Sequence, residues 1–266
     1  FNSIYLVKYL AGTLTLINKE FGFNKVYVLH QDVAWARAGA EVMKKVFFDK
    51  AGWEVLGMEA YPTGSTDFSS ALMKARAKGA EVILPIFDMP QSGILVKQWK
   101  SMKVPALMFG FISPLAGSNA WKTFDKKIGG GMNNNFEIGN SIATPKVPKS
   151  KVFFDKYKKV YGKEIQSGHG VAPAYEAVYI LTEAIERAGS LDPDAIVAEL
   201  EKTDRTGVMG RIKFDEGHQV VYGFDPNETA LAAVLQWTDD GNRKIVFPAS
   251  IANGKIHLPK GLNSLK

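Results

Sequence analysis

The sequence predicts an α/β protein with a parallel β-sheet that helices cover on both faces. Between residues 25 and 111, short apolar runs alternate with helical patterns, and parallel strands need long crossovers of this kind. The apolar runs are continuous rather than alternating, which is typical of strands buried on both faces. Length and composition agree, because 266 residues with 46% hydrophobic side chains suffice for more than one core.

The first predicted element is a helix over residues 4–20. Its apolar side chains recur at steps of three and four residues, which gives one buried stripe, and Gly22 ends the helix. Its continuous apolar run is shorter than the roughly 20 residues that a membrane-spanning helix needs. The run also lacks the basic start and the cleavage site of a signal peptide. Because the chain starts at Phe1 rather than at Met, we expect a mature or truncated product.

Strands and helices then alternate along the chain. Strands are predicted at residues 26–30, 54–61, 82–87 and 106–111. The helices between them are predicted from about Ala38 to Gly52, at residues 67–77 and at residues 91–102. The alternation ends near Gly129-Gly130-Gly131, and residues 140–151 form a polar connector with two prolines, which is a crossover candidate.

The C-terminal half is predicted to mix helices with antiparallel strands. Helices are predicted at residues 152–161, 171–188 and 192–202, and either Ser190 or Asp192 is expected to cap the last one. Further strands are predicted at residues 211–214, 231–237 and 244–247. The turn Asp239-Asp240-Gly241-Asn242 joins the last two strands into a hairpin.

Composition and motifs exclude several functional classes. The net charge of +6 comes from Lys and Arg scattered along the chain, so we expect no nucleic-acid partner. The absence of cysteine excludes thiol chemistry, disulfides and cysteine-ligated zinc. The four histidines stand apart in the sequence, and the glycine triplet at 129–131 lacks the Lys-Ser/Thr of a phosphate loop. We therefore expect neither an enzyme nor a metal site nor a cofactor.

The residues that follow the predicted strands are the candidates for ligand binding, since loops and helix N-termini converge at the carboxyl edge of an open α/β sheet. After the first strand, Trp35 either walls an apolar ligand or lies half-buried against its own helix. After the third strand, Asp88 either accepts hydrogen bonds from a ligand ammonium group or caps the next helix. At the end of the fourth strand, Phe111 and Ile112 offer apolar contacts.

Several short motifs occur in an order that is specific in combination and extends over nearly the whole chain. They are Lys25-Val26-Tyr27-Val28-Leu29-His30, Gly64-Ser65-Thr66-Asp67-Phe68, Gly79-Ala80-Glu81-Val82-Ile83, Ala174-Tyr175-Glu176-Ala177-Val178-Tyr179, Ala184-Ile185-Glu186-Arg187-Ala188-Gly189, Gly210-Arg211-Ile212-Lys213-Phe214-Asp215-Glu216-Gly217 and Gln236-Trp237. This pattern resembles the type I periplasmic binding-protein fold and, within it, the leucine/isoleucine/valine-binding family.

The resemblance implies two Rossmann-like lobes with parallel sheets, joined by a hinge that the chain crosses three times. Residues 1–141 would form the second ligand-binding lobe, with Phe1 just after the first crossover. Residues 142–230 would return to the first lobe, and residues 231–266 would cross back and form the C-terminal tail. The N-terminal segment of the first lobe would then be missing, so that the lobe is incomplete in this chain.

The resemblance also assigns positions in the binding site. Trp35 falls where the family places an aromatic residue that covers the ligand, and Asp88 or Met89 falls near a second aromatic position. Ile112 stands where the family has an acidic residue that holds the amino group. The last two positions depart from the family pattern, unless Asp88 replaces the acid. The departure leaves both an amino acid and a more apolar aromatic or aliphatic acid open as ligand.

The function implied by the resemblance is the capture of a small amino acid or a related carboxylate, which is delivered to the permease of an ABC importer. The location implied is periplasmic or extracellular. A ligand-sensing domain of a receptor or of a transcription regulator with the same fold is the alternative. A flavodoxin-like enzyme is the third hypothesis, for which Gly64-Ser65-Thr66 is the nearest phosphate-loop candidate, although no lysine stands beside it.

Overall fold

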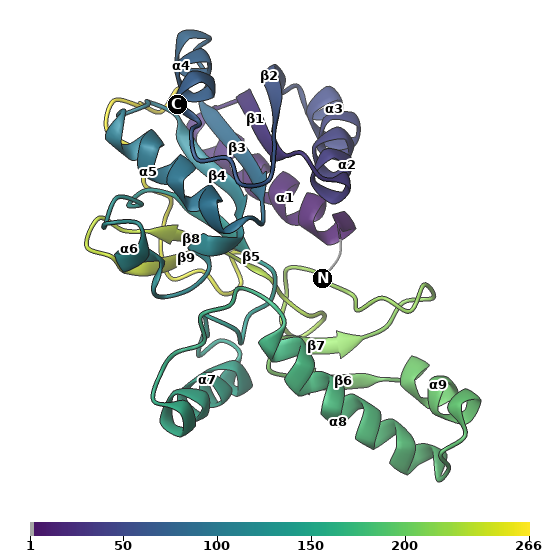
Figure 1. The fold of residues 1–266 in the computed structure, drawn as a ribbon. Helices are drawn as coiled ribbons and strands as arrows, with labels where there is room; N and C mark the ends of the chain where they lie inside the picture. The colour runs from purple at the N-terminus through teal and green to yellow at the C-terminus, as the bar shows by residue number, and fades with distance from the viewer. Residues whose placement is uncertain (1–2) are drawn as a thin grey trace. The chain divides into compact units, whose positions relative to one another are not determined.

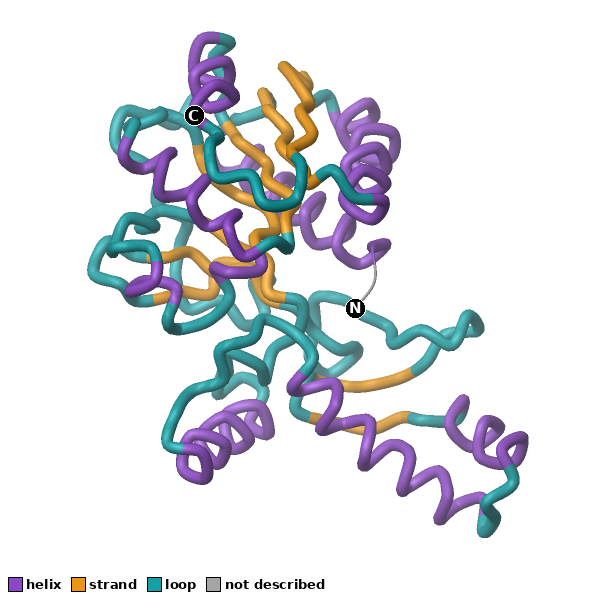
Figure 2. The backbone as a smooth tube through the Cα atoms, viewed as in Figure 1, coloured by secondary structure: helices purple, strands orange, loops and turns teal. Residues whose placement is uncertain are grey.

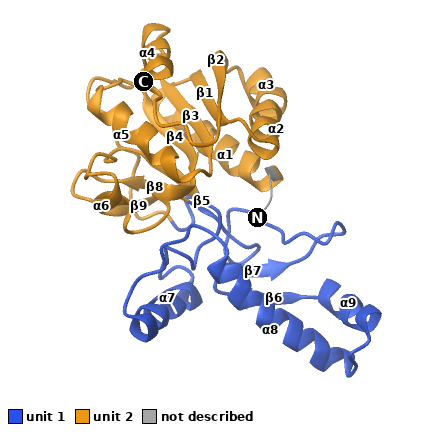
Figure 3. Ribbon diagram, in the orientation of Figure 1, with its two compact units in different colours: residues 1, 135–233, 248–251 blue, residues 2–134, 234–247, 252–266 orange. Residues whose placement is uncertain are grey.

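The computed structural model describes residues 3–266, which fold into a mixture of helices and strands (Figure 1). The chain divides into two compact units, shown in separate colours in Figure 3. The larger unit extends to Asn134 and also contains Val234–Phe247 and Ala252–Lys266, and the smaller unit contains Asn135–Ala233 and Pro248–Ile251. None of the helices within residues 3–266 combines the length and the apolar character needed to cross a membrane. The predicted position of Phe1 after a crossover lies outside the described residues.

The larger unit is built around a seven-stranded sheet in the order β2-β1-β3-β4-β5-β8-β9. Its strands are β1 (Lys25–Gln31), β2 (Glu54–Tyr61), β3 (Val82–Phe87), β4 (Leu107–Ile112), β5 (Met132–Asn135), β8 (Ala233–Trp237) and β9 (Arg243–Phe247). Strands β1 to β5 pair in parallel, whereas β8 and β9 form an antiparallel hairpin. Every residue of β3 and β4 is buried, as their continuous apolar sequences require. The predicted parallel sheet and the predicted hairpin are therefore both confirmed.

Helices cover both faces of this sheet, as Figure 2 shows. Their bounds are α1 (Ser3–Phe21), α2 (Ala34–Met43), α3 (Asp49–Ala51), α4 (Ser69–Ala77), α5 (Gly93–Ser101) and α6 (Ala120–Thr123), with short turns η1 (Lys44–Phe48), η2 (Pro90–Ser92) and η3 (Ser113–Leu115). A buried apolar cluster joins one face of the sheet to α4 and α5 through Leu72, Leu95 and Trp99. The predicted strand–helix order is thus the observed one.

One predicted helix is interrupted in the structure. The segment predicted to end at Gly52 consists of α2, a π-helical turn at Lys44–Phe48 and the short α3. The wider π turn accommodates Phe48, whose ring is fully buried 6.1 Å from that of Trp53. Gly52 then ends the segment as predicted, with a φ of 72° that favours glycine.

The smaller unit contains the three predicted helices, α7 (Pro148–Tyr161), α8 (Val171–Ala188) and α9 (Pro193–Glu201). Of the two predicted caps for α9, the structure selects Asp192, whose carboxylate accepts a hydrogen bond of 3.0 Å from the N–H of Ala195. Helix α7 begins earlier than predicted because Pro148 suits the first turn, where a missing N–H is tolerated.

A two-stranded antiparallel sheet completes the described elements of the smaller unit, with β6 (Asp204–Gly207) beside β7 (Gly210–Lys213). Strand β6 was not predicted, because its sequence Asp-Arg-Thr-Gly has no apolar run. Pairing with β7 and an ion pair between Arg211 and Asp204, at 2.7 Å, hold it in place. Such a strand depends on tertiary contacts rather than on its own sequence.

The N-terminus of α8 is anchored by the segment that enters the smaller unit. Gly170 stands at the N-cap and has no side chain to offer, but the side-chain oxygen of Asn140 accepts a hydrogen bond of 2.6 Å from the N–H of Ala172. The amide nitrogen of Asn140 donates to the carboxylate of Glu137 at 2.9 Å. Burial raises the pKa of Glu137 to about 7, although hydrogen bonds from Asn140 and from the backbone of Gly170 favour the charged form.

Candidate functional site

The carboxyl edge of the sheet in the larger unit brings together the predicted ligand-binding segments. Strands β1, β3 and β4 are parallel neighbours and end at Gln31, Phe87 and Ile112. Parallel strands end on the same side of a sheet, so the loops that carry Trp35, Asp88 and the end of β4 meet at one edge. The strand pairing therefore confirms the prediction that these loops share one edge of the sheet.

Gln31, which was not among the predicted residues, ties three segments of this edge together. Its buried side-chain oxygen accepts hydrogen bonds from the N–H groups of Asp88, at 3.0 Å, and Met89, at 3.2 Å. Its amide nitrogen donates to the hydroxyl of Thr63 at 2.9 Å. The loops after β1, β2 and β3 are thereby held in fixed relative positions. The only sequence signal for this role was the place of Gln31 at the end of the first strand.

Trp35 and Phe111 form an aromatic pair at the edge. Trp35 stands in the first turn of α2 and is half-buried, while Phe111 is the next-to-last residue of β4. Their ring centroids are 5.9 Å apart with an interplanar angle of 71°, which is an edge-to-face contact. Trp35 therefore packs across the sheet edge onto another strand as well as against its own helix.

Asp88 presents an exposed carboxylate beside this edge. The interpretation of Asp88 as a helix cap is wrong, because the N-cap residues of η2 and α5 are Met89 and Ser92. The loop is fixed from behind instead, through the hydrogen bond that the Asp88 N–H donates to Gln31. An exposed carboxylate on a rigid backbone is suited to accept hydrogen bonds from a cationic group of a ligand.

Met89 and Ile112 lie in the core in this structure. Met89 is 2% exposed and its sulfur accepts a hydrogen bond of 3.3 Å from the N–H of Gly64, while Ile112 is fully buried. The N–H of Ile112 donates to the side-chain oxygen of Asn133 at 2.7 Å, which links the ends of β4 and β5. Both side chains belong to the apolar cluster beneath α4 and α5. They fix the strand ends on which Phe111 and Asp88 stand.

The edge offers an aromatic wall, one free-standing carboxylate and a backbone that is held in place by buried amides. These groups can hold a small ligand with an apolar body and a cationic group. Within residues 3–266, no three histidine, aspartate or glutamate side chains are placed to hold a metal ion. In the Gly64-Ser65-Thr66 loop, the Gly64 N–H and the Ser65 hydroxyl are bonded to Met89 and to the Pro62 carbonyl, so neither is directed at a phosphate.

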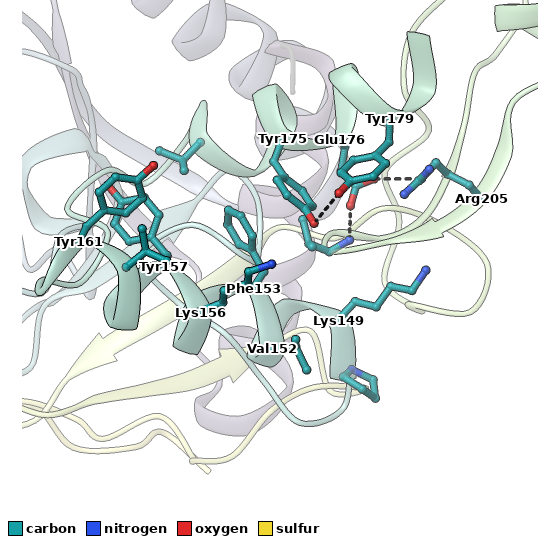
Figure 4. Close-up of a pocket in the computed structure, with 14 residues that line it drawn as sticks. Lys149, Val152, Phe153, Lys156, Tyr157, Tyr161, Tyr175, Glu176, Tyr179 and Arg205 are labelled. Carbon is teal, nitrogen blue, oxygen red and sulfur yellow. Dashed lines mark hydrogen bonds and ion pairs between the residues drawn. The ribbon is translucent and has the colours of Figure 1, made fainter. Parts of the chain in front are cut away.

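A groove in the smaller unit is a second hollow, which was not predicted from the sequence (Figure 4). It has a volume of about 760 Å³ and lies between α7 and α8, with further contributions from Arg205 and Val208. Figure 4 shows the rings of Phe153, Tyr157 and Tyr161 on α7 and those of Tyr175 and Tyr179 on α8 along it. The pattern was visible in the sequence, since apolar residues recur on α7 at steps of three and four.

The groove is apolar and largely open to solvent. Val152 and Val160 of α7 are 65% and 63% exposed, which is unusual for side chains of a helix that packs on a core. One charged cluster closes its side: Arg205 pairs with the buried Glu176 at 3.0 Å and lies 5.2 Å from the ring centre of Tyr179. The charged groups of Arg205 and Glu176 pair with each other, so this cluster stabilises the fold of the smaller unit.

Comparison with known proteins assigns the chain to a family. A family model described as periplasmic binding protein matches residues 7–245. The chain belongs to the periplasmic binding protein family. A "Leu/Ile/Val-binding protein homolog 7" from Brucella suis biovar 1 (strain 1330) is 24% identical over 265 residues, which cover 96% of this chain and 62% of the relative. The chain thus spans less than two thirds of that relative's length.

Two further comparisons agree with this assignment. The "Leucine-, isoleucine-, valine-, threonine-, and alanine-binding protein" of Pseudomonas aeruginosa is 28% identical over 227 residues, or 85% of this chain and 57% of the relative. The crystal structure of a leucine binding protein from Thermotoga maritima MSB8 matches with a TM-score of 0.71 at 21% identity, covering 90% of this chain and 64% of that one. The predicted type I periplasmic-binding-protein fold is confirmed. The roles of Trp35, Asp88, Met89, Phe111 and Ile112 in this periplasmic binding protein stay predictions.

Proposed function

We propose that this chain is part of an extracytoplasmic solute-binding protein, which captures a small amino acid or a related carboxylate and passes it to the permease of an ABC importer. The observation that carries the proposal is the carboxyl edge of the larger unit, which carries both the Trp35–Phe111 ring pair and the exposed carboxylate of Asp88. The names of the relatives from Brucella suis and Pseudomonas aeruginosa support the same ligand class. The proposed activity is capture without chemical turnover.

In the proposed binding mode, the ring pair covers the apolar body of the ligand. Asp88 accepts hydrogen bonds from the ammonium group, a role that Ile112 cannot take because its side chain is apolar and fully buried. Met89 and Ile112 contribute indirectly in this proposal. Their packing in the core holds the two strand ends that carry Asp88 and Phe111. Affinity then comes from aromatic burial together with a few charge-assisted hydrogen bonds.

The two units correspond, in this proposal, to parts of two lobes. The larger unit is the second lobe, and the smaller unit is the portion of the chain, about residues 142–230, that returns to the first lobe. In this proposal, the remaining sheet of that lobe in a longer protein packs against the apolar groove between α7 and α8. Ligand that binds the closed arrangement more tightly shifts the hinge equilibrium, and the permease recognises the closed form at the outer face of the membrane.

Replacing Asp88 with asparagine tests the proposed ammonium contact. In the full-length protein, we expect Asp88→Asn to weaken binding of L-leucine by about tenfold, because a charge-assisted hydrogen bond becomes a neutral one. Binding of 4-methylpentanoate, which is leucine without its amino group, is expected to stay unchanged. Calorimetric titration of both compounds into both proteins provides the measurement.

Asp32→Asn is the matched control, because Asp32 also follows a strand at this edge but is already ion-paired with Arg37. The control should bind both compounds as the unaltered protein does. Equal losses for leucine and for 4-methylpentanoate in Asp88→Asn would show that Asp88 does not contact the amino group. Failure of the unaltered protein to bind any amino acid or carboxylate would refute the proposed function itself.

A further inference from the structure

The side chain of Asn134 is a buried amide without a hydrogen-bond partner. Asn134 is 0% exposed, and neither its amide nitrogen nor its oxygen has a partner among the residues that the structure describes. Its two asparagine neighbours are used structurally: Asn133 accepts the N–H of Ile112, and Asn135 donates to the hydroxyl of Ser141 at 3.0 Å. Buried amides in folded proteins are nearly always hydrogen-bonded, so Asn134 requires a specific explanation.

The place of Asn134 in the sheet supplies that explanation. Strand β5 pairs in parallel with β4, with Phe109 opposite Met132 and Gly110 opposite Asn133. The same register continued by one residue places Asn134 beside Phe111, and paired residues of neighbouring strands point to the same face of the sheet. Asn134 therefore shares the sheet face of Phe111, whose ring contacts Trp35. The unpartnered amide stands at the carboxyl end of its strand, next to the aromatic wall of the proposed site.

We propose that Asn134 is a specificity-determining residue, which supplies a hydrogen-bond donor and an acceptor to the side chain of the captured ligand. A buried amide without hydrogen bonds lowers the stability of the ligand-free protein. A ligand that forms those hydrogen bonds recovers the lost free energy, which explains why such a residue is kept at a binding site. The inference rests on the proposed function, because it places Asn134 within that ligand site. It specifies the chemical group at the end of the ligand that lies away from Asp88.

The partner of this amide must itself offer both a donor and an acceptor. A charged group is disfavoured beside a fully buried neutral amide, because it would lose its hydration without gaining a counter-charge. A neutral hydroxyl or carboxamide meets both conditions. With the ammonium group at the exposed Asp88 and the ligand body against Trp35 and Phe111, the preferred class is amino acids with a hydroxyl or carboxamide side chain.

Asn134→Leu tests the inference through stability, without any ligand. Leucine has the branched shape of asparagine and, although it is larger, removes both unsatisfied groups, so the melting temperature of the ligand-free, full-length protein should rise by about 3 °C. A fall in the melting temperature that is shared by the smaller variant Asn134→Ala, which cannot overpack the core, would overturn the inference, because it would mean that water or another part of the protein already satisfies the amide.

The second measurement is ligand selectivity in two nearly isosteric pairs, L-threonine against L-valine and L-asparagine against L-leucine. The unaltered protein should bind the polar member of at least one pair about tenfold more tightly, and Asn134→Leu should abolish or reverse that preference. Thr203→Val is the control: Thr203 also has a buried hydroxyl without a partner in the described chain, but it lies in the smaller unit, so selectivity should not change.

The outcomes separate the two proposals. A preference that survives in Asn134→Leu, or a preference of the unaltered protein for the apolar member of both pairs, would overturn the role of Asn134 and leave the proposed function standing. Binding of none of the four amino acids by the unaltered protein would instead refute amino-acid capture, and the role of Asn134 with it.

Discussion

Replacing Trp35 with alanine is expected to weaken ligand binding by about 10- to 100-fold while the larger unit stays folded. Trp35 is half-buried and packs edge-to-face on Phe111, so its loss removes the wall of the proposed site without opening the core. An edge-to-face ring pair of this kind contributes about 1 kcal/mol to stability beyond the burial of its rings, which is small against the total for a domain. Calorimetric titration with L-leucine measures the affinity, and thermal unfolding measures the stability.

Trp121→Ala is the matched control for this prediction. Trp121 is also half-buried and stacks on another ring, that of Trp237 at 6.1 Å, but it packs on the hairpin formed by β8 and β9. The control should lose at least as much stability as Trp35→Ala and keep its affinity. Unchanged affinity in Trp35→Ala would mean that the ring serves only to pack α2 on the sheet, and the site would have to be placed elsewhere.

Glu137→Gln is expected to remove a large pH dependence of stability. Burial raises the pKa of Glu137 from 4.5 to about 7, so the folded state keeps a proton that the unfolded state has lost between these values. The associated stability is present below the unfolded pKa and is lost as the pH rises through about 7, with an upper limit of about 3 kcal/mol. Urea unfolding of the smaller unit's helices, followed by far-ultraviolet circular dichroism, measures the loss.

The glutamine variant should show a flatter profile and exceed the unaltered protein in stability above about pH 7. Glutamine can still accept the hydrogen bond that Asn140 donates to Glu137, so the anchor of α8 is kept. Glu186→Gln is the control, because Glu186 lies exposed on α8 and its replacement should not change the slope. A slope that is the same in Glu137→Gln and in the unaltered protein would assign the pH dependence to other groups.

Much of the fold followed from the sequence because its strands are buried on both faces. The apolar runs of β3 and β4 have no polar residue at any buried position, so they could be placed from composition alone. Strand β6 could not, because it has no apolar run and depends on pairing with β7. The π-helical turn at Lys44–Phe48 was equally hidden, since a helical period does not reveal one extra residue in a turn.

The site was predictable in its place but not in its contacts. The rule that ligands bind at the carboxyl edge selected Trp35, Asp88 and Phe111 one by one. That Trp35 contacts Phe111 depends on how α2 packs across the sheet, which the spacing of residues in the chain does not fix. For the same reason Gln31 and Asn134 were missed: the bonds of Gln31 and the lack of partners at Asn134 follow from strand register.

Solute capture requires that the full-length protein binds a small molecule. A native mass spectrum of the purified protein should show the folded chain together with a species heavier by one small molecule, whose mass matches an amino acid or a related carboxylate. L-Leucine or L-threonine added in excess should displace that molecule. A spectrum of the bare chain alone, unchanged when these amino acids are added, would contradict solute capture by this protein.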